Sequence, residues 1–222
     1  MTTLTPATFA AMVDHTLLAP TATGDDIEAL CESAREFGTA SVCVNPSWVP
    51  LASSSLDDSE VMVCTVAGFP RGADQSEAVA ATARIAIAEG ADEVDVVIPF
   101  GRIIGDDQAF VADYLAQVRD AAAGVTLKVI IESATLSDNQ IVTACNLSVE
   151  AGADFVKTST GFHAAGGSSV AAVALMRSTV GPDLGVKASG GIRTLSDVEA
   201  MVGAGANRLG MSATAAVLAE IG

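Results

Sequence analysis

Eight short runs rich in β-branched and other apolar residues alternate with alanine-rich stretches along this 222-residue chain. Near-continuous apolarity is typical of strands that are covered on both faces, and the stretches between the runs are long enough to be helices joining parallel strands. The alternation predicts an α/β fold, a single-domain (β/α)8 TIM barrel over residues 1–222 with a short N-terminal helix at about 5–13. The predicted strands are 15–18, 40–44, 61–67, 92–98, 126–132, 154–159, 184–189 and 207–210.

A common register links the even-numbered strands. Counting five residues on from each of four helix-ending glycines gives one residue per even strand: Cys43, Asp95, Lys157 and Gly210. In a barrel of this type, alternate strands supply the four side chains of one interior layer. Because the offset is the same on each strand, we expect these four residues to face one another in a layer too polar for ordinary core.

All three lysines lie inside apolar runs instead of on polar helix surfaces. Lysine is almost never fully buried without a partner, and a buried amine is a candidate nucleophile because burial lowers its pKa. Lys157 and Lys187 lie late in their strands, at the end where active sites of this fold are found. Lys128 lies early in its strand, so we interpret it as structural, held by a partner such as Glu93 or Glu132. Glu132 is equally well interpreted as a site carboxylate.

Two neighbouring lysines can activate one another. At its reference pKa of about 10.4, roughly one lysine in a few thousand is a free amine at pH 7. Burial beside a second cation lowers that pKa, and a shift of about 2–3 units corresponds to roughly 3–4 kcal/mol. We therefore expect one of Lys157 and Lys187 to be a nucleophile and the other to tune it. Spacing does not decide between them, although Asp95 makes Lys157 the better-placed partner for proton transfer.

Glycine-rich turns follow the last two predicted strands. Gly190 and Gly191 come after the seventh strand. Gly210 ends the eighth strand, and Ser212 follows it before a final helix. Loops at these two places, beside a helix N-terminus, usually form the phosphate site of this fold; the alternative is two tight turns that need glycine. A buried amine with an anion site predicts a phosphorylated aldehyde or ketone as substrate.

Composition limits the other classes of function. The net charge of −16 argues against binding to nucleic acid or to an anionic membrane. The four cysteines show no CxxC spacing and no clustered histidines, so we expect neither a disulfide framework nor a bound metal, and no cofactor. No secretion signal or long apolar segment is seen, which predicts a cytoplasmic protein. The oligomeric state is left open, a homodimer included.

Motifs along nearly the whole chain resemble the 2-deoxy-D-ribose 5-phosphate aldolase family. The resemblance implies a metal-independent class I aldolase that splits 2-deoxyribose 5-phosphate into acetaldehyde and glyceraldehyde 3-phosphate. It also implies that Lys157 forms the Schiff base, that Lys187 lowers its pKa, and that Asp95 transfers protons. The motifs are DHTLL (14–18), SVCVNP (41–46), GFPRG (68–72), EVDVVI (93–98), KVIIE (128–132), FVKTSTGF (155–162), VKASGGIR (186–193) and RLG (208–210).

Several positions add detail to this expectation. Cys43 and Thr158 are predicted to line the pocket. Met211 and Ala213 stand where hydroxyl residues are common in the family, which leaves Ser212 and backbone donors to hold the phosphate. A preference for less charged aldehydes is therefore an alternative. A phosphate-binding barrel isomerase, or a barrel that binds sugar phosphates without catalysis, is a rival reading.

Two further groups lack an assigned role. Asp14 either orients the first loop or makes a turn hydrogen bond. The histidines, His15 and His163, are interpreted as structural or loop residues.

Overall fold

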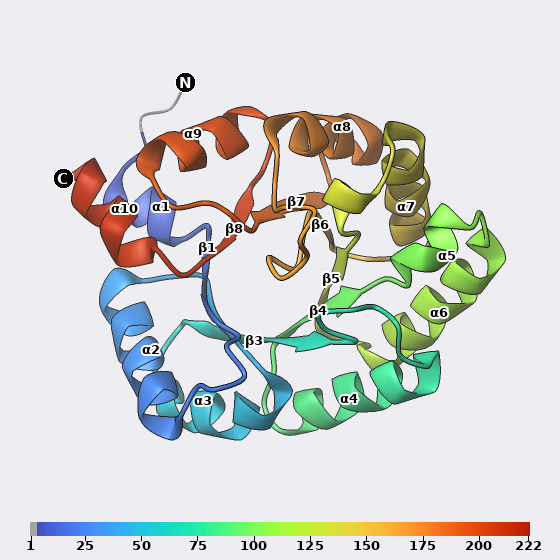
Figure 1. Cartoon of the computed structure of the whole chain (residues 1–222). Coiled ribbons are helices and arrows are strands. Elements are labelled where there is room, and N and C mark those ends of the chain that lie inside the picture. Colours follow the sequence, from blue (N-terminus) through green and yellow to red (C-terminus); the bar gives the residue numbers. More distant parts are fainter. Residues whose placement is uncertain (1–3) are drawn as a thin grey trace.

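The computed structural model describes residues 4–222, in which eight parallel strands alternate with helices and close into one barrel (Figure 1). Each strand pairs with the next, and β8 pairs with β1. The strands are β1 (Val13–Leu17), β2 (Ser41–Val44), β3 (Met62–Ala67), β4 (Glu93–Val97), β5 (Thr126–Ile130), β6 (Phe155–Lys157), β7 (Gly185–Ser189) and β8 (Arg208–Met211).

Helices surround this barrel on the outside (Figure 1). They are α1 (Pro6–Ala10), α2 (Gly24–Phe37), α3 (Val49–Ser55), α4 (Ser76–Ala88), α5 (Phe100–Ile104), α6 (Gln108–Ala121), α7 (Asp138–Glu150), α8 (Val170–Val180), α9 (Leu195–Gly203) and α10 (Thr214–Ile221), with 3₁₀ turns η1 (Pro46–Trp48) and η2 (Ser133–Thr135). None of the helices within residues 4–222 has the length and apolarity needed to cross a lipid bilayer.

The predicted barrel is confirmed, and each predicted strand overlaps an observed one. The leading helix was expected to reach about residue 13, which is wrong, because α1 ends at Ala10. Val13 instead pairs with Leu209 of β8, and the Leu209 amide donates to the carbonyl of Met12 at 2.8 Å. The strand that closes the barrel therefore draws residues 12 and 13 into the sheet.

The hydrophobic core lies between the strands and the helices. Alternate strand residues, such as Val94 and Val96 of β4, point outward and are fully buried against helical side chains, among them Tyr114 and Leu115 of α6. Burying one large aliphatic side chain contributes about 1.5–3 kcal/mol. Because this outer layer supplies the apolar burial, the inward-facing residues of the same strands are free to be polar.

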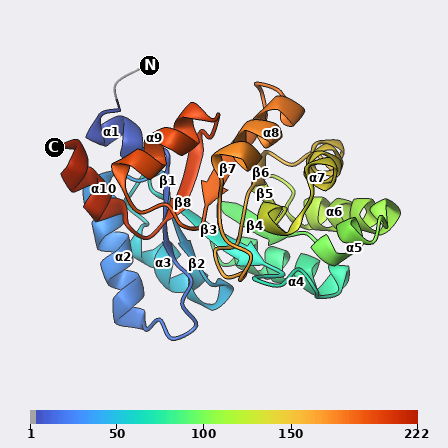
Figure 2. The same cartoon turned by 45° about the horizontal axis from the view of Figure 1, so that its top comes forward.

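The two terminal helices cover the seam of the barrel. α1 and α10 lie side by side next to β1 and β8 in both views (Figures 1 and 2). The segment that joins β6 to α8 lies over the centre of the barrel in the view of Figure 1. The open end, with the loops that follow the strands, is where the polar interior can be reached.

Candidate active site

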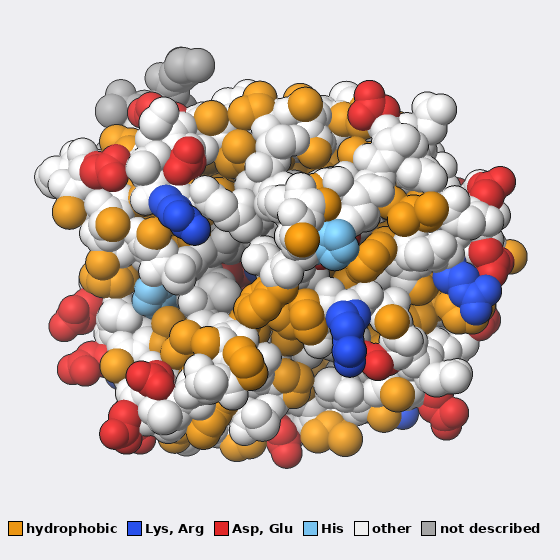
Figure 3. All heavy atoms as spheres, in the orientation of Figure 1, with side chains coloured by type: hydrophobic (Ala, Val, Ile, Leu, Met, Phe, Trp, Pro, Cys, Tyr) orange, Lys and Arg blue, Asp and Glu red, His pale blue; other side chains and the backbone are white. Residues whose placement is uncertain are grey.

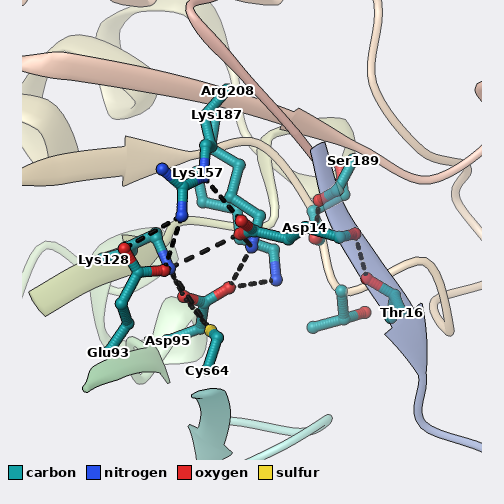
Figure 4. Close-up of polar contacts among 12 residues, drawn as sticks. Asp14, Thr16, Cys64, Glu93, Asp95, Lys128, Lys157, Lys187, Ser189 and Arg208 are labelled. Atoms are coloured by element: carbon teal, nitrogen blue, oxygen red, sulfur yellow. Dashed lines mark hydrogen bonds and ion pairs between the residues drawn. The ribbon is translucent and has the colours of Figure 1, made fainter. Parts of the chain in front are cut away.

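A network of charged side chains fills the barrel interior (Figure 4), and we call it the ion cluster. Every member belongs to a strand and is buried. The cluster therefore draws on six of the eight strands and sits where the core of an ordinary barrel would be apolar. Its members are Asp14 (β1), Glu93 and Asp95 (β4), Lys128 (β5), Lys157 (β6), Lys187 (β7) and Arg208 (β8).

Asp95 stands at the centre of the ion cluster. Its Oδ2 accepts from Lys157 Nζ at 2.7 Å and from Lys187 Nζ at 2.6 Å. Its Oδ1 accepts from Lys128 Nζ at 2.9 Å and from Cys64 Sγ at 3.2 Å. Burial alone would raise the pKa of Asp95, but the three ammonium groups lower it well below its usual value. One carboxylate oxygen thus bridges the two lysines that the sequence singled out.

Lys187 and Lys128 are held by several carboxylates. Lys187 Nζ bonds to Asp14 Oδ2 as well as to Asp95. Lys128 Nζ lies 2.6 Å from Glu93 Oε2 and 3.5 Å from Asp14 Oδ2, in addition to Asp95. Burial lowers the pKa of each amine, but the surrounding carboxylates outweigh it and raise both pKa values above the usual lysine range. Both side chains are therefore cations at neutral pH.

Arg208 ties the remaining carboxylates together. Its Nε donates to Asp14 Oδ1 at 2.5 Å, and its Nη2 donates to both oxygens of Glu93 at 2.8 and 2.9 Å. Burial acts against the charged form of Arg208, but Asp14 and Glu93 raise its pKa. Glu93 in turn holds Lys128 at 2.6 Å. This fork of hydrogen bonds fixes the acids that position the lysines.

The cluster contains four basic groups and three carboxylates, since Lys128, Lys157, Lys187 and Arg208 face Asp14, Glu93 and Asp95. An uncompensated buried charge is strongly unfavourable, so the cluster is best balanced when one base is neutral. Lys157 has a single carboxylate partner, and its side chain is 4% exposed, whereas those of Lys128 and Lys187 are 0% exposed. Lys157 is thus the lysine with the fewest carboxylate contacts and the greatest exposure.

The structure brings three of the four residues predicted for one interior layer close together. Lys157 contacts Asp95, and ligand atoms of Cys43 and Asp95 lie within 4.8 Å of each other. Gly210 instead makes room for the neighbouring lysine, because a Cβ built there would lie 3.0 Å from Lys187 Cε. The absence of a side chain at position 210 therefore lets the Lys187 side chain extend to Asp95.

Two side chains have contacts other than those expected. Thr158 was predicted to line the pocket, but its hydroxyl donates to the Ser189 carbonyl at 3.2 Å and accepts from the Ser189 amide at 3.0 Å, so it joins β6 to β7. Its position follows from strand alternation, since its neighbour Lys157 points inward. Glu132 does not pair with Lys128, which bonds to Glu93; it accepts instead from the Thr160 hydroxyl at 2.6 Å.

The residues proposed for the anion site lie at the open end. Gly190 and Gly191 have φ of 85° and 86°, which favours glycine, and Gly190 also approaches the β6–α8 segment so closely that a Cβ would lie 3.0 Å from Gly167 Cα. Ser212 is exposed just before α10, whereas Met211 is buried in the core. Met211, which stands where hydroxyl residues are common in the family, therefore packs in the core and not at the proposed anion site.

Two edge-to-face ring contacts hold the β6–α8 segment over the open end. Phe162 packs edge-to-face on Phe69, with ring centroids 5.3 Å apart, and His163 packs in the same manner on Phe100 at 5.9 Å. The same face shows hydrophobic side chains beside a central hollow, with acidic side chains spread around its margin (Figure 3). The segment therefore narrows the entrance to the ion cluster with apolar groups.

Both histidines make structural contacts. His163 Nδ1 accepts from the Ala165 amide at 3.1 Å within its own loop. His15 points out of the barrel, where its ring nitrogens bond to the hydroxyls of Thr214 at 2.8 Å and Ser33 at 3.2 Å. Burial lowers the pKa of His15. Neither ring contacts the ion cluster among the described residues.

The fold and this cluster together define a class of protein: a TIM-barrel enzyme with a buried lysine–carboxylate centre suited to covalent chemistry on a carbonyl compound. Residues 8–218 match the family described as DeoC/LacD family aldolase. The chain belongs to this aldolase family.

Curated relatives and solved structures agree with this assignment. The chain is 53% identical to the deoxyribose-phosphate aldolase of Lysinibacillus sphaericus, over 95% of this chain and 94% of that protein. It is 52% identical to that of Listeria monocytogenes serotype 4a, over 95% of both chains. The tetrameric deoxyribose phosphate aldolase of Aeropyrum pernix superposes with a TM-score of 0.91 at 33% identity, covering 97% of this chain and 92% of that one.

Proposed function

We propose that this chain is a class I deoxyribose-phosphate aldolase in which Lys157 is the Schiff-base lysine. Membership of the aldolase family and the curated relatives named deoxyribose-phosphate aldolase support the reaction. The substrates are a small sugar phosphate and aldehydes. The observation that supports the residue assignment is the bridge made by Asp95 Oδ2 between Lys157 and Lys187 at the base of the open end.

The first half of the reaction forms the covalent intermediate. The neutral amine of Lys157 adds to C1 of open-chain 2-deoxyribose 5-phosphate, and loss of water gives an iminium ion. Asp95 lies 2.7 Å from Lys157 Nζ, within reach to take and return the protons that this addition and dehydration exchange. Lys187, which stays protonated, keeps Asp95 ionised and so able to accept a proton.

The second half breaks the carbon–carbon bond. The iminium withdraws electrons from the C2–C3 bond, while Asp95, acting through an ordered water, removes the proton of the C3 hydroxyl. Glyceraldehyde 3-phosphate leaves, and the enamine on Lys157 is protonated at C2 and hydrolysed to acetaldehyde. Each proton step that uses a positioned group is worth typically about 10²–10⁴-fold in rate.

We place the 5-phosphate at the loops after β7 and β8. Gly190 and Gly191 give a backbone turn without side chains, and the exposed Ser212 precedes the N-terminus of α10, so amides and one hydroxyl are available to an anion. Gly210, at the end of β8, keeps the backbone there close to Lys187. Cys43 lies beside Asp95 and would contact the C1–C2 end of the substrate.

The test is a retro-aldol assay with 2-deoxyribose 5-phosphate and with 2-deoxyribose, on the wild type and on Lys157→Ala. We expect cleavage of the phosphorylated sugar by the wild type, a higher KM without the phosphate, and no turnover by the variant. Equal kcat/KM for the two sugars would support instead an aldolase that prefers less charged aldehydes. Full activity of Lys157→Ala would favour a barrel enzyme that uses no covalent amine.

Two expectations from the sequence remain proposals of their own. The oligomeric state stays open between a homodimer and a larger assembly, and the Aeropyrum pernix relative is described as a tetramer. Equilibrium sedimentation of the full chain separates the two assemblies. The cytoplasmic location is tested by fractionating cells that express the chain from its own gene.

A further inference from the structure

Two cysteine thiols face each other inside the barrel, next to the proposed catalytic groups. Cys43 of β2 and Cys64 of β3 are directly opposite in the parallel register, and both are buried. Their Sγ atoms and a carboxylate oxygen of Asp95 all lie within 4.8 Å of one another. Neighbouring strands are about 4.8 Å apart, which lies within the Cα separations that a disulfide spans, and the curvature of a barrel brings inward-pointing side chains closer together.

The surroundings of the two thiols differ in a way that suits thiol oxidation. Contact with Cys64 and the charges of Lys187 and Lys157 lower the pKa of the Cys43 thiol, and together they outweigh burial and the charge of Asp95, which raise it. Burial raises the pKa of Cys64 well above its usual value, although Lys128 Nζ lies 3.3 Å from its sulfur. The thiolate is the reactive form, so Cys43 is the thiol that reacts first and Cys64 is its resolving partner.

We propose that Cys43 and Cys64 form a redox-sensitive dithiol, which small hydroperoxides convert to a disulfide that inhibits the enzyme. The Cys43 thiolate attacks one peroxide oxygen, the O–O bond breaks, and a Cys43 sulfenic acid forms as water or an alcohol leaves. The Cys64 thiol then attacks the Cys43 sulfur, the S–O bond breaks, and a second water leaves. The two thiols lose two electrons in total, and these reduce the peroxide.

The disulfide would disturb Asp95 directly. Cys64 donates its S–H to Asp95 Oδ1 at 3.2 Å, and a disulfide has no such proton. The same sulfur accepts from Lys128, which also holds Asp95 at 2.9 Å. Oxidation therefore removes one of the donors that hold Oδ1 of Asp95. The other oxygen of Asp95, Oδ2, bridges Lys157 and Lys187. This inhibitory effect rests on the proposed function, whereas formation of the bond does not.

The other two cysteines provide matched controls. Cys31 in α2 and Cys145 in α7 are also buried, but they lie on helices outside the barrel. Burial raises the pKa of Cys31 to about 11 and that of Cys145 to about 12, so neither is a ready thiolate.

The experiment treats the reduced full-length protein with hydrogen peroxide in the presence of a chelator. Free thiols, the masses of non-reduced peptides and the retro-aldol rate are measured on the same samples. We expect a loss of two thiols, a Cys43–Cys64 peptide, and a rate that falls about tenfold or more at full linkage and returns with dithiothreitol. Cys31→Ala and Cys145→Ala should behave as the wild type does, each relative to its own untreated rate.

The variants Cys43→Ala and Cys64→Ala make the result decisive. Each should form no intramolecular disulfide and should show no loss of rate that dithiothreitol reverses. Absence of the Cys43–Cys64 peptide in the oxidised wild type, or a bond that involves Cys31 or Cys145 instead, would overturn the proposal. A complete Cys43–Cys64 bond with an unchanged rate would overturn the inhibitory role. If the reduced protein has no aldolase activity, the proposed function fails while the peptide mass still reports the bond.

Discussion

Replacing Lys128 with methionine tests whether the charge balance of the ion cluster activates Lys157. Methionine keeps a side chain of similar length but removes one of four basic groups that face three carboxylates. The three remaining bases then face three carboxylates, so the cluster is balanced with every base charged, and a neutral base in it is disfavoured. The acidic limb of the kcat/KM profile should therefore move to higher pH.

The size of this shift follows from the geometry around Asp95. Lys128 Nζ lies 2.9 Å from Oδ1 and Lys157 Nζ lies 2.7 Å from Oδ2 of the same carboxylate. Two unit charges about 6 Å apart at an effective dielectric constant of about 20 interact by about 3 kcal/mol. That energy corresponds to about two pH units. The fold should tolerate the change, because Asp95 keeps Lys157 and Lys187 as partners.

The assay is kcat/KM for 2-deoxyribose 5-phosphate across pH, for the wild type, Lys128→Met and Arg102→Met. Arg102 forms a surface pair with Asp107, and its side chain is 53% exposed, so its removal changes the net charge equally but far from the barrel interior. We expect Arg102→Met to leave the profile in place, because solvent and salt screen surface charges. An acidic limb that stays in place or moves to lower pH in Lys128→Met would show that the charge of Lys128 does not set the pH dependence of the enzyme.

Three other changes have defined outcomes. Asp95→Asn should lower kcat by about 10²–10⁴-fold with a smaller effect on KM, as steady-state kinetics will show; an unchanged kcat would remove Asp95 from the proton steps. Gly210→Ala should lower kcat and cost about 1–3 kcal/mol of stability by chemical denaturation, because the added Cβ would meet Lys187 Cε at 3.0 Å; a normal kcat would show that Lys187 has room to move. Because burial lowers the pKa of His15, the unfolded chain binds more protons at this residue than the folded chain does below about pH 6.5. The contribution of neutral His15 to the free energy of unfolding is therefore present above about pH 6.5 and is lost as pH falls through the folded pKa. Thermal melts of the wild type and His15→Gln between pH 8 and 5 should diverge at high pH and converge on acidification, and parallel curves would contradict the assignment.

The part of the site that could be predicted from sequence is the part set by position within single strands. The shared offset from helix-ending glycines identified Asp95 and Lys157, which are in contact, because strand alternation and helix termination are local properties. Alternation also explains why the Thr158 hydroxyl bonds to the neighbouring strand, at the Ser189 carbonyl.

Other contacts of the cluster depend on the register between strands. Lys128 bonds to Glu93, as the sequence led us to expect, but it is also the middle residue of β5 and lies directly opposite Asp95 in the β4–β5 register, so it contacts Asp95 as well. Glu93 and Arg208 lie two residues before Asp95 and Gly210, and therefore point inward one layer below. That common offset of two was a signal available in the sequence, but the pairing of strands that brings these charges together was not.

The most direct test of the central claim is reduction with borohydride in the presence of acetaldehyde, followed by peptide mapping. We expect one irreversibly ethylated lysine, at Lys157, because borohydride reduces the imine that acetaldehyde forms with this amine to a stable secondary amine. Lys157→Arg should remain unlabelled. Labelling of Lys187 or Lys128 in the wild type, or no stable adduct in an active enzyme, would contradict the assignment of Lys157 as the Schiff-base lysine.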